Sequence, residues 1–204
     1  MIELLLIPFG FMLGAIPFAV LIGQYGLGVD IRQYGDGNPG AFNVLRARGI
    51  GWGGVALILD ISKGAIPAGL AVHIFHIDGL LLVLIAISPV LGHAFSPFLS
   101  FKGGKAIAAT AGMLIGLSLL VLPTVFMISL IVFYLVLTSS AWAVMFTMFT
   151  LFIYMVLIQS PLTWFAAVGS TLIILIYRHH KELSKLPELT KRARFLHRHH
   201  TNNY

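Results

Sequence analysis

Residues 97–110 read PFLSFKGGKAIAAT, and this short polar stretch lies between two long apolar runs. In the whole chain of 204 residues only 10% are charged, whereas 58% are hydrophobic and the mean hydropathy is +0.95. Such a composition is far outside the range of soluble domains and predicts an integral membrane protein. The two lysines of the stretch therefore need a specific explanation.

Apolar runs on both sides of this stretch predict membrane-spanning helices, because a helix of about 20 apolar residues crosses the hydrocarbon core. The chain beyond residue 107 is the hardest to divide, since only Gly116 and Pro123 interrupt one apolar block. We expect an all-α polytopic membrane protein with about seven transmembrane helices in one domain, residues 1–180, followed by a basic cytoplasmic tail, residues 181–204. The predicted spans are Leu4–Leu27, Ile50–Phe75, Leu80–Leu99, Ile107–Leu120, Pro123–Leu137, Trp142–Ile158 and Leu162–Tyr177.

The Lys and Arg residues indicate how these helices are oriented. Of the 13, three lie between the first two spans, two in the opening stretch and seven from residue 178 onward. An odd number of spans puts all three groups on one face, whereas the connections around 75–79, 120–123 and 159–161 contain no Lys or Arg. Because basic residues concentrate on the cytoplasmic side, we expect the N-terminus outside and the C-terminus in the cytoplasm. The polar loops and the start of the tail can then converge on one site.

Within the opening stretch, two glycines and a lysine form a candidate anion site. Gly103 and Gly104 let the backbone come close to a ligand, and the helix predicted from Ala106 points its first N–H groups toward the loop. Together with Lys105, this arrangement has the physics of a phosphate-binding loop. Lys102 can bind the same anion, or it can anchor the helix at the lipid headgroups.

The connection between the first two spans has a similar character. Its sequence GDGNPGAFNVLRARG at 35–49 combines glycines that permit tight turns with two amides that can donate hydrogen bonds, Asn38 and Asn43. Arg46 can bind an oxyanion through two parallel hydrogen bonds. Glycines are also common at helix contacts in membranes, so a structural role for this loop stays open. Two such loops on one face predict a ligand that carries phosphate.

Two further polar positions lie inside predicted spans. Asp60 and Lys63 are three residues apart and share one helical face. They form either a mutually satisfied structural pair or a group in which Asp60 anchors Lys63 at a polar pocket. His93, near the end of the third span, can donate a hydrogen bond to a bound anion or satisfy a neighbouring carbonyl.

The chain has no cysteine, which excludes disulfides, thiolate catalysis and cysteine-based metal sites. The FLHRHH cluster at 195–200 has no carboxylate or thiolate beside its histidines, so we expect a basic tail that touches anionic lipid and no metal site. We also expect no cofactor and no nucleic-acid partner. The oligomeric state stays open.

Four segments in the chain carry a family pattern. They are GDGNPGAFN at 35–43, LDISKGAIPA at 59–68, LGHAFSPFLSFKGGKAIAAT at 91–110 and IYRHHKEL at 176–183. In order, spacing and overall length they resemble the motifs of the bacterial acyl-phosphate:glycerol-3-phosphate acyltransferase family. The resemblance covers nearly the whole chain, and the third segment is its most specific part.

The resemblance implies a seven-helix enzyme of the bacterial inner membrane whose active site faces the cytoplasm. Such an enzyme transfers a fatty acyl group from acyl phosphate to glycerol 3-phosphate and forms lysophosphatidic acid for phospholipid synthesis, with a substrate phosphate oxygen taking the proton. By motif, Lys105, Arg46 and His179 receive catalytic roles, and either Ser139 or Ser140 resembles a serine of the family's fifth loop. Together with the candidates argued above, the predicted substrate-binding residues are Asp36, Asn38, Asn43, Lys63, His93, Lys102, Gly103, Gly104, Ser139, Ser140, Arg178 and Glu182.

Four positions depart from the family's pattern. They are Asp36 in place of a serine, Phe42 in place of a threonine, Ala106 in place of a glycine and Glu182 in place of an asparagine. A carboxylate about 6 Å from a phosphate charge costs on the order of 3 kcal/mol at an effective dielectric near 20, or about a hundredfold in affinity. We expect the two carboxylates to pair with basic residues, Arg46 being the first candidate for Asp36. Without such pairing, the chain would be a non-catalytic or re-specialised relative that binds or transports a phosphorylated lipid or a small anion.

Overall fold

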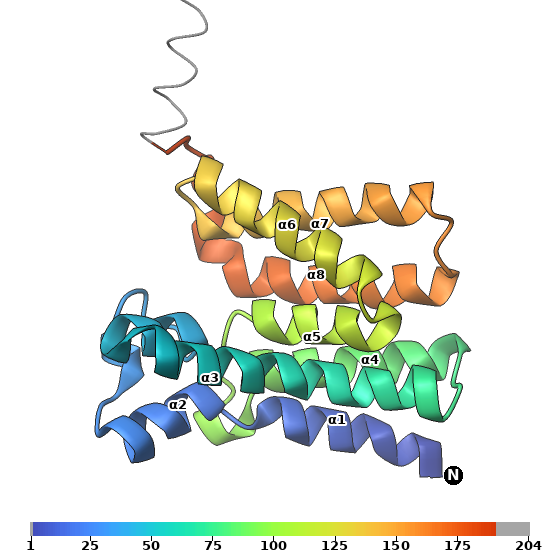
Figure 1. The fold of residues 1–204 in the computed structure, drawn as a ribbon, viewed down its shortest axis with the longest axis horizontal. Coiled ribbons are helices and arrows are strands. Elements are labelled where there is room, and N and C mark those ends of the chain that lie inside the picture. Colours follow the sequence, from blue (N-terminus) through green and yellow to red (C-terminus); the bar gives the residue numbers. More distant parts are fainter. Residues whose placement is uncertain (1, 191–204) are drawn as a thin grey trace, which may run out of the picture.

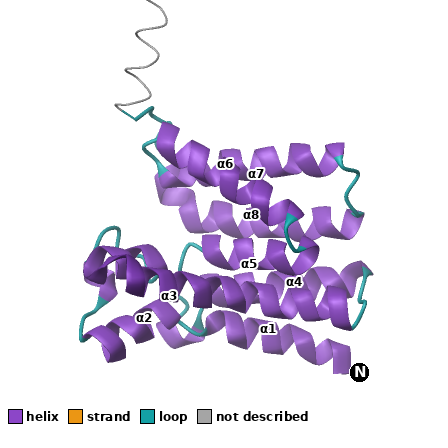
Figure 2. Cartoon of the chain, viewed as in Figure 1, coloured by secondary structure: helices purple, strands orange, loops and turns teal. Residues whose placement is uncertain are grey.

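The computed structural model describes residues 2–190, which fold into the bundle of helices shown in Figure 1. Within that range the secondary structure is helical, apart from one isolated antiparallel bridge between Leu137 and Leu189 (Figure 2). The elements are η1 (Ile2–Leu5), α1 (Leu6–Ala15), α2 (Phe18–Leu21), η2 (Ile22–Gly26), η3 (Ile31–Gln33), α3 (Ala41–Gly69), η4 (Leu70–Ile74), α4 (Gly79–Ala94), η5 (Pro97–Leu99), α5 (Ile107–Ser118), α6 (Val121–Val136), α7 (Ser140–Leu157) and α8 (Leu162–Leu183).

Helix length and composition support the membrane assignment. In the described part of the chain, 5 helical stretches are long and apolar enough to cross a membrane, and α5 and α6 are shorter apolar helices of 12 and 16 residues. The central apolar block breaks at residues 119–120, and Pro123 lies in the first turn of α6, where its missing N–H has no helical partner to lose. The predicted all-α polytopic fold is confirmed.

Helices α1 and α2 follow each other across the bundle, and from α3 to α8 successive helices run in alternating directions, so the connections gather at the two ends of the bundle (Figure 1). The connections at 28–40, 95–106 and 137–139 lie toward the left of the figure, together with the end of α8. Those at 75–78, 119–120 and 158–161 lie at the opposite end. The predicted convergence of the polar loops on one end is therefore confirmed.

Helices α3 and α8 both extend beyond the predicted spans. Helix α3 begins at Ala41 and kinks where Gly49 adopts a φ of +82°, directly before the predicted start of the span. Helix α8 continues to Leu183, and the backbone N–H of Thr138 then donates to the carbonyl of Glu188 at 2.9 Å. The first part of the predicted tail therefore packs back against the connection between α6 and α7. The remainder, including the histidine cluster at 195–200, lies outside the described residues.

Glycines set the close contact between α3 and α5. A Cβ added at Gly112 would collide with the carbonyl oxygen of Ile61 and lie 2.9 Å from the nitrogen of Ala65. A Cβ added at Gly64 would likewise meet backbone atoms of α5. Because backbone cannot swing aside as a flexible side chain can, small residues are required at this crossing, as in many membrane helix pairs.

Replacing Gly112 with alanine should therefore destabilise the bundle by about 2 kcal/mol, since overpacking a tight contact typically costs 1–3 kcal/mol. Thermal unfolding of the purified protein in detergent would measure the effect. Gly54→Ala is the matched control in α3, because a Cβ at Gly54 has no atom within 4 Å. An unfolding temperature for Gly112→Ala equal to that of Gly54→Ala would contradict the proposed contact.

Candidate active site

The ammonium of Lys105 is the centre of a charged cluster where the polar loops meet. Its Nζ lies 2.8 Å from Asp36 Oδ2 and also pairs with Glu182 Oε1. The side chain of Lys105 is only 16% exposed, whereas those of Asp36 and Glu182 are 45% and 38% exposed. The lysine is thus held beneath two carboxylates that remain accessible to solvent.

The loop before α3 fixes the position of Asp36. Its Oδ1 accepts hydrogen bonds from the backbone N–H of Asn38 at 3.2 Å and from the side-chain amide of Asn43 at 3.1 Å. The carbonyl oxygen of that amide accepts a hydrogen bond from Arg46 Nη1 at 3.1 Å. Gly35 completes the turn with a φ of +58°, and a Cβ there would collide with the side chains of Asn43 and Arg46.

The expected pairing of the two carboxylates is confirmed, but Arg46, the expected partner of Asp36, is the more distant of the two cations that pair with it. Arg46 Nη1 lies 4.0 Å from Asp36 Oδ1, at the limit of an ion pair, whereas Lys105 makes a direct hydrogen bond. Arg46 was favoured because it lies on the same loop, and Lys105 is 69 residues away in sequence. Only the folded bundle brings it to Asp36.

Arg178 holds the second glycine-rich loop from α8. Its Nε donates to the carbonyl of Gly104 at 3.1 Å, and its Nη2 donates to the carbonyl of Gly103. The guanidinium carbon also lies 6.0 Å from the centroid of the Phe95 ring, within cation–π range. Arg178 therefore spends two of its N–H donors on the loop backbone and holds in place the loop that carries Lys105.

The loop leads directly into α5. Ala106 is the N-cap residue of α5 and has a φ of +61°, a left-handed conformation that glycine adopts without strain. The N–H groups of the first turn, which have no partner within the helix, begin at Ile107, two residues after Lys105. The expected combination of a lysine and a helix N-terminus is present at this end of the bundle.

His179 lies in the same part of α8 and is 1% exposed. Its Nδ1 lies 2.8 Å from the carbonyl oxygen of Leu175, and because a carbonyl only accepts, Nδ1 carries the proton. Nε2 then has a free lone pair, and within residues 2–190 it has no hydrogen-bond partner. The ring also interacts with the charges of Lys105 and Glu182.

The structure distinguishes between the two candidate serines. Ser140 Oγ donates to Glu182 Oε2 at 2.8 Å and so belongs to the charged cluster. Ser139 is instead the N-cap of α7, where its Oγ accepts the N–H of Trp142 at 3.5 Å. Of the two serines that resemble the family's serine, Ser140 is therefore the one that lies in the charged cluster, and a substrate contact by either stays a prediction.

Asp36 and Lys105 stabilise each other's charged forms. Burial alone would raise the pKa of Asp36, but the hydrogen bond and charge of Lys105 outweigh it and leave this pKa below its ordinary value. Burial alone would lower the pKa of Lys105, but hydrogen bonds to Asp36 and Glu182 raise it above its ordinary value. The contribution of Asp36 to stability is lost only as the pH falls through its lowered pKa, and that of Lys105 only as the pH rises through its raised pKa. The pair is therefore intact at neutral pH, with its acid limit below the ordinary pKa of an aspartate and its alkaline limit above that of a lysine.

Three predicted substrate-binding residues lie away from this cluster. Lys63 pairs with Asp60 at 2.8 Å, with side-chain exposures of 1% and 3%, which is the geometry of the structural alternative. His93 is buried behind Gly104. Lys102 is exposed and forms no ion pair within residues 2–190. A substrate contact by any of these three remains a prediction.

One residue of the cluster was missed in the sequence. Tyr134 of α6 lies beside Ser140 and interacts with the charges of Lys105 and Glu182. Its ring stacks on that of Phe42, with centroids 6.5 Å apart and an angle of 21° between the planes. Tyr134 stands in an apolar span with no motif around it, so no sequence signal pointed to the site.

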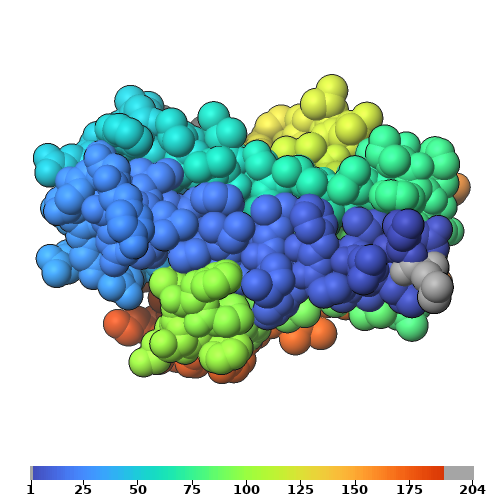
Figure 3. All heavy atoms as spheres, turned by 90° about the horizontal axis from the view of Figure 1, so that it is seen from below, coloured from blue at the N-terminus to red at the C-terminus, as the bar shows by residue number. Residues whose placement is uncertain are grey.

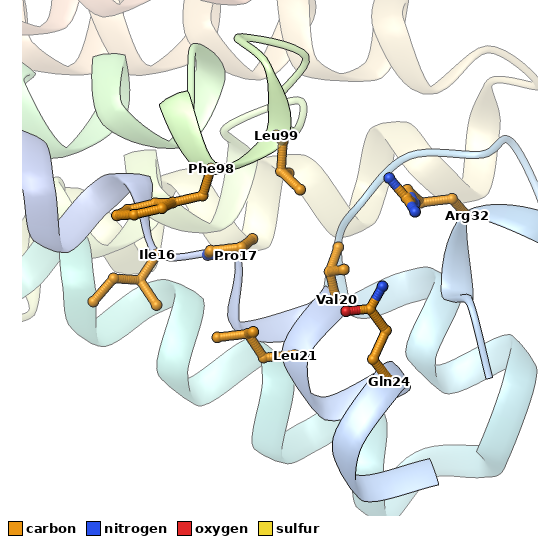
Figure 4. A pocket seen from close by; sticks show the side chains of 8 residues that line it. All are labelled: Ile16, Pro17, Val20, Leu21, Gln24, Arg32, Phe98 and Leu99. Carbon is orange, nitrogen blue, oxygen red and sulfur yellow. The ribbon is translucent and has the colours of Figure 1, made fainter. Parts of the chain in front are cut away.

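A separate groove lies on the outer surface beside α2. Figure 3 shows the segment around 97–103 on the surface beside the N-terminal residues. Between them is a cavity of about 310 Å³, and Figure 4 shows apolar side chains along it with Gln24 and Arg32 toward one end. The guanidinium of Arg32 is already paired with Asp30 through two hydrogen bonds of 2.9 Å. The residues that line the groove are Ile16, Pro17, Val20, Leu21, Gln24, Arg32, Phe98 and Leu99.

Known sequences carry the same pattern over most of this chain. A family model described as glycerol-3-phosphate acyltransferase matches residues 4–188. A glycerol-3-phosphate acyltransferase of Lactococcus lactis is 34% identical over 193 residues, covering 91% of this chain and 90% of that protein. Glycerol-3-phosphate acyltransferase 1 of Thermotoga maritima is 52% identical over 79 residues, covering 38% of this chain and 39% of that protein.

Solved structures agree with the sequence matches. The glycerol 3-phosphate form of PlsY (YgiH), an integral membrane glycerol 3-phosphate acyltransferase, superposes with a TM-score of 0.82 at 31% identity and covers 90% of this chain and 91% of that chain. The lysophosphatidic acid form of that protein gives a TM-score of 0.80 at 30% identity. The resemblance seen in the motifs is confirmed, and this chain belongs to the glycerol-3-phosphate acyltransferase family.

Proposed function

We propose that this chain transfers a fatty acyl group from acyl phosphate to a hydroxyl of glycerol 3-phosphate and releases lysophosphatidic acid. Family membership and the ligand forms of the solved relative support the acceptor and the product. The choice of acyl phosphate as donor rests on the motif resemblance. Lysophosphatidic acid would enter phospholipid synthesis.

The observation that carries this proposal is the presentation of Lys105 by a glycine loop at a helix N-terminus. An ammonium has three N–H donors. Asp36 and Glu182 take two of them, which leaves one for a substrate phosphate oxygen. The carboxylates also hold the ammonium in one place, so little ordering is needed when the substrate binds.

Charge balance at the cluster still favours an anion. Lys105 and Arg46 pair with the carboxylates of Asp36 and Glu182, and Arg178 binds the loop backbone beside them, so three cations and two carboxylates leave one net positive charge. The unpaired N–H groups at the start of α5 add to the positive potential. The alternative of a non-catalytic, anion-binding relative depends on uncompensated repulsion, and the two ion pairs of Lys105 argue against it.

Acyl transfer from an activated donor needs mainly positioning and charge stabilisation. The acceptor hydroxyl oxygen forms a bond to the acyl carbon, the bond from that carbon to the phosphate oxygen breaks, and phosphate leaves with the bonding electrons. Lys105 and Arg46 stabilise the charge that gathers on the carbonyl oxygen and the departing phosphate. The hydroxyl proton passes to a phosphate oxygen, and His179 Nε2, which is free within residues 2–190, accepts a hydrogen bond from the substrate.

We further propose that the site faces the cytoplasm of a bacterial inner membrane. The basic loops and the end of α8 share one end of the bundle in Figure 1, and basic residues favour the cytoplasmic side. The N-terminus would then lie outside. Both substrates would be drawn from the cytoplasmic face.

Removing the Lys105 amine should lower kcat/KM for acyl transfer at least about a hundredfold, because a preorganised charge-assisted contact is lost. The assay is acyl-phosphate-dependent acylation of glycerol 3-phosphate by purified protein in lipid. Lys102→Ala is the comparison on the same loop: if Lys102 only anchors the helix at the headgroups, kcat/KM should change by less than about threefold, since Lys102 is exposed and its removal breaks no ion pair within residues 2–190. Equal, mild losses for Lys105→Ala and Lys102→Ala would favour an interface-anchor role for both.

A reporter fused after Tyr204 should be cytoplasmic and one at the N-terminus external, because an odd number of spans separates the ends of the bundle. A third reporter inserted in the connection at 75–78 should share the N-terminal side. Finding both termini on one side of the membrane would overturn the proposed orientation.

A further inference from the structure

A buried polar layer lies directly behind the second glycine-rich loop and has no part in the chemistry above. Asp60 and Lys63 of α3 are each 2% exposed, and His93 of α4 is 7% exposed. Isolated charges and imidazoles are costly at such depth unless they are paired. Their contacts therefore indicate what they support.

Lys63 connects α3 to the break between α1 and α2. Its Nζ lies 2.8 Å from Asp60 Oδ1 and donates to the carbonyl of Ile16 at 3.0 Å. Ile16 and Pro17 have non-helical backbone, and this carbonyl also accepts the backbone N–H of Phe18 at 3.1 Å in place of a helical i+4 donor. The lysine satisfies that carbonyl and fixes α3 against the break.

His93 supports the glycine loop in two ways. Its backbone carbonyl accepts the N–H of Gly104 at 3.0 Å. Its ring lies against the same glycine, since a Cβ added at Gly104 would collide with Nε2 and lie 3.0 Å from Cδ2. Gly104 does not have a positive φ, so its backbone conformation would accept a side chain. It is the His93 ring that excludes one. Gly103 differs, because a Cβ there would collide with the backbone carbonyls of His93 and Ala94.

The same layer also meets the first glycine-rich loop. His93 Nδ1 lies 3.9 Å from Asp60 Oδ1 and has no hydrogen-bond partner within residues 2–190. A small buried cavity of about 10 Å³ is bounded by Pro39 of the first loop, by Lys63 and His93, and by Gly104 of the second loop. Both loops therefore border the cavity that these side chains line.

We infer that His93 is a positioning residue of the acyl-transfer site, and that its buried ring sets the position of Gly104 and thereby of Lys105. On α3, Asp60 lies 3.9 Å from the ring, and Lys63 lines the same small cavity as the ring. The expected effect on acyl transfer rests on the proposed function, whereas the expected effect on the position of the loop rests on the structure alone.

A double-mutant cycle between His93 and Gly104 tests it. Gly104→Ala should lower kcat/KM about a hundredfold, because the new methyl group collides with the ring and displaces the loop. His93→Ala should lower it about tenfold. In the double variant the smaller side chain makes room, so kcat/KM should return to within about threefold of His93→Ala alone, a coupling that independent sites do not show.

Gly103→Ala is the matched control. Its methyl group meets backbone carbonyls that remain in His93→Ala, so adding His93→Ala should recover no activity. Unfolding temperatures of all variants separate loss of fold from loss of position. Equal recovery at both glycines, or no recovery at Gly104, would overturn the inference.

Hydrogen exchange of residues 101–107 in the same variants distinguishes a failure of this inference from a failure of the proposed function. Gly104→Ala should speed exchange in this segment. In the Gly104→Ala/His93→Ala double variant, exchange should return to the rate of His93→Ala alone, whereas in the Gly103→Ala/His93→Ala double variant it should stay fast. An inactive parent protein would overturn the proposed function, and the exchange rates would still decide the role of His93. Exchange that is unchanged in Gly104→Ala would contradict the role of the ring.

Discussion

The ammonium of Lys105, placed between two carboxylates, is the interaction on which the arrangement of this end of the bundle depends. It joins the loop before α3, the loop before α5 and the end of α8, three segments that are far apart in sequence. Asn43 and Arg46 extend the network on one side, and Ser140 extends it on the other. A largely buried lysine with fewer partners would be unfavourable, so the two carboxylates stabilise the cation to which we assign the substrate phosphate.

The bundle itself is built so that these loops can approach one another. Close helix contacts at glycines bring α3 against α5 and α1 against α4. The break after α1 exposes a carbonyl that Lys63 satisfies, and the resulting polar layer supports the glycine loop from behind. The two charged residues of this layer, Asp60 and Lys63, thus pair with each other, which explains how they are tolerated at membrane depth.

The helices could be predicted from the sequence because apolar length alone decides whether a segment spans a membrane. The gathering of the polar loops at one end of the bundle could also be predicted, since glycines and cations are concentrated in the connections on one face. The kink at Gly49, which divides α3, has no counterpart in apolar length and was not predicted. The direct contact of Asp36 with Lys105 was not predictable either, because the 69 residues between them are bridged only by tertiary structure. Tyr134 was missed because it lies in an apolar span with no motif around it.

The central claim is that Asp36 and Glu182 are compensated by Lys105 and leave the site able to bind phosphate. The direct measurement is the apparent affinity for glycerol 3-phosphate and for acyl phosphate in the parent protein and in the Asp36→Ser/Glu182→Asn double variant. Because Lys105 and Arg46 remain in both proteins, the account predicts an active parent and affinities that change by less than about tenfold, the factor that 1.4 kcal/mol represents. An inactive parent whose affinity rises about a hundredfold or more in the double variant would show uncompensated repulsion and would contradict the account.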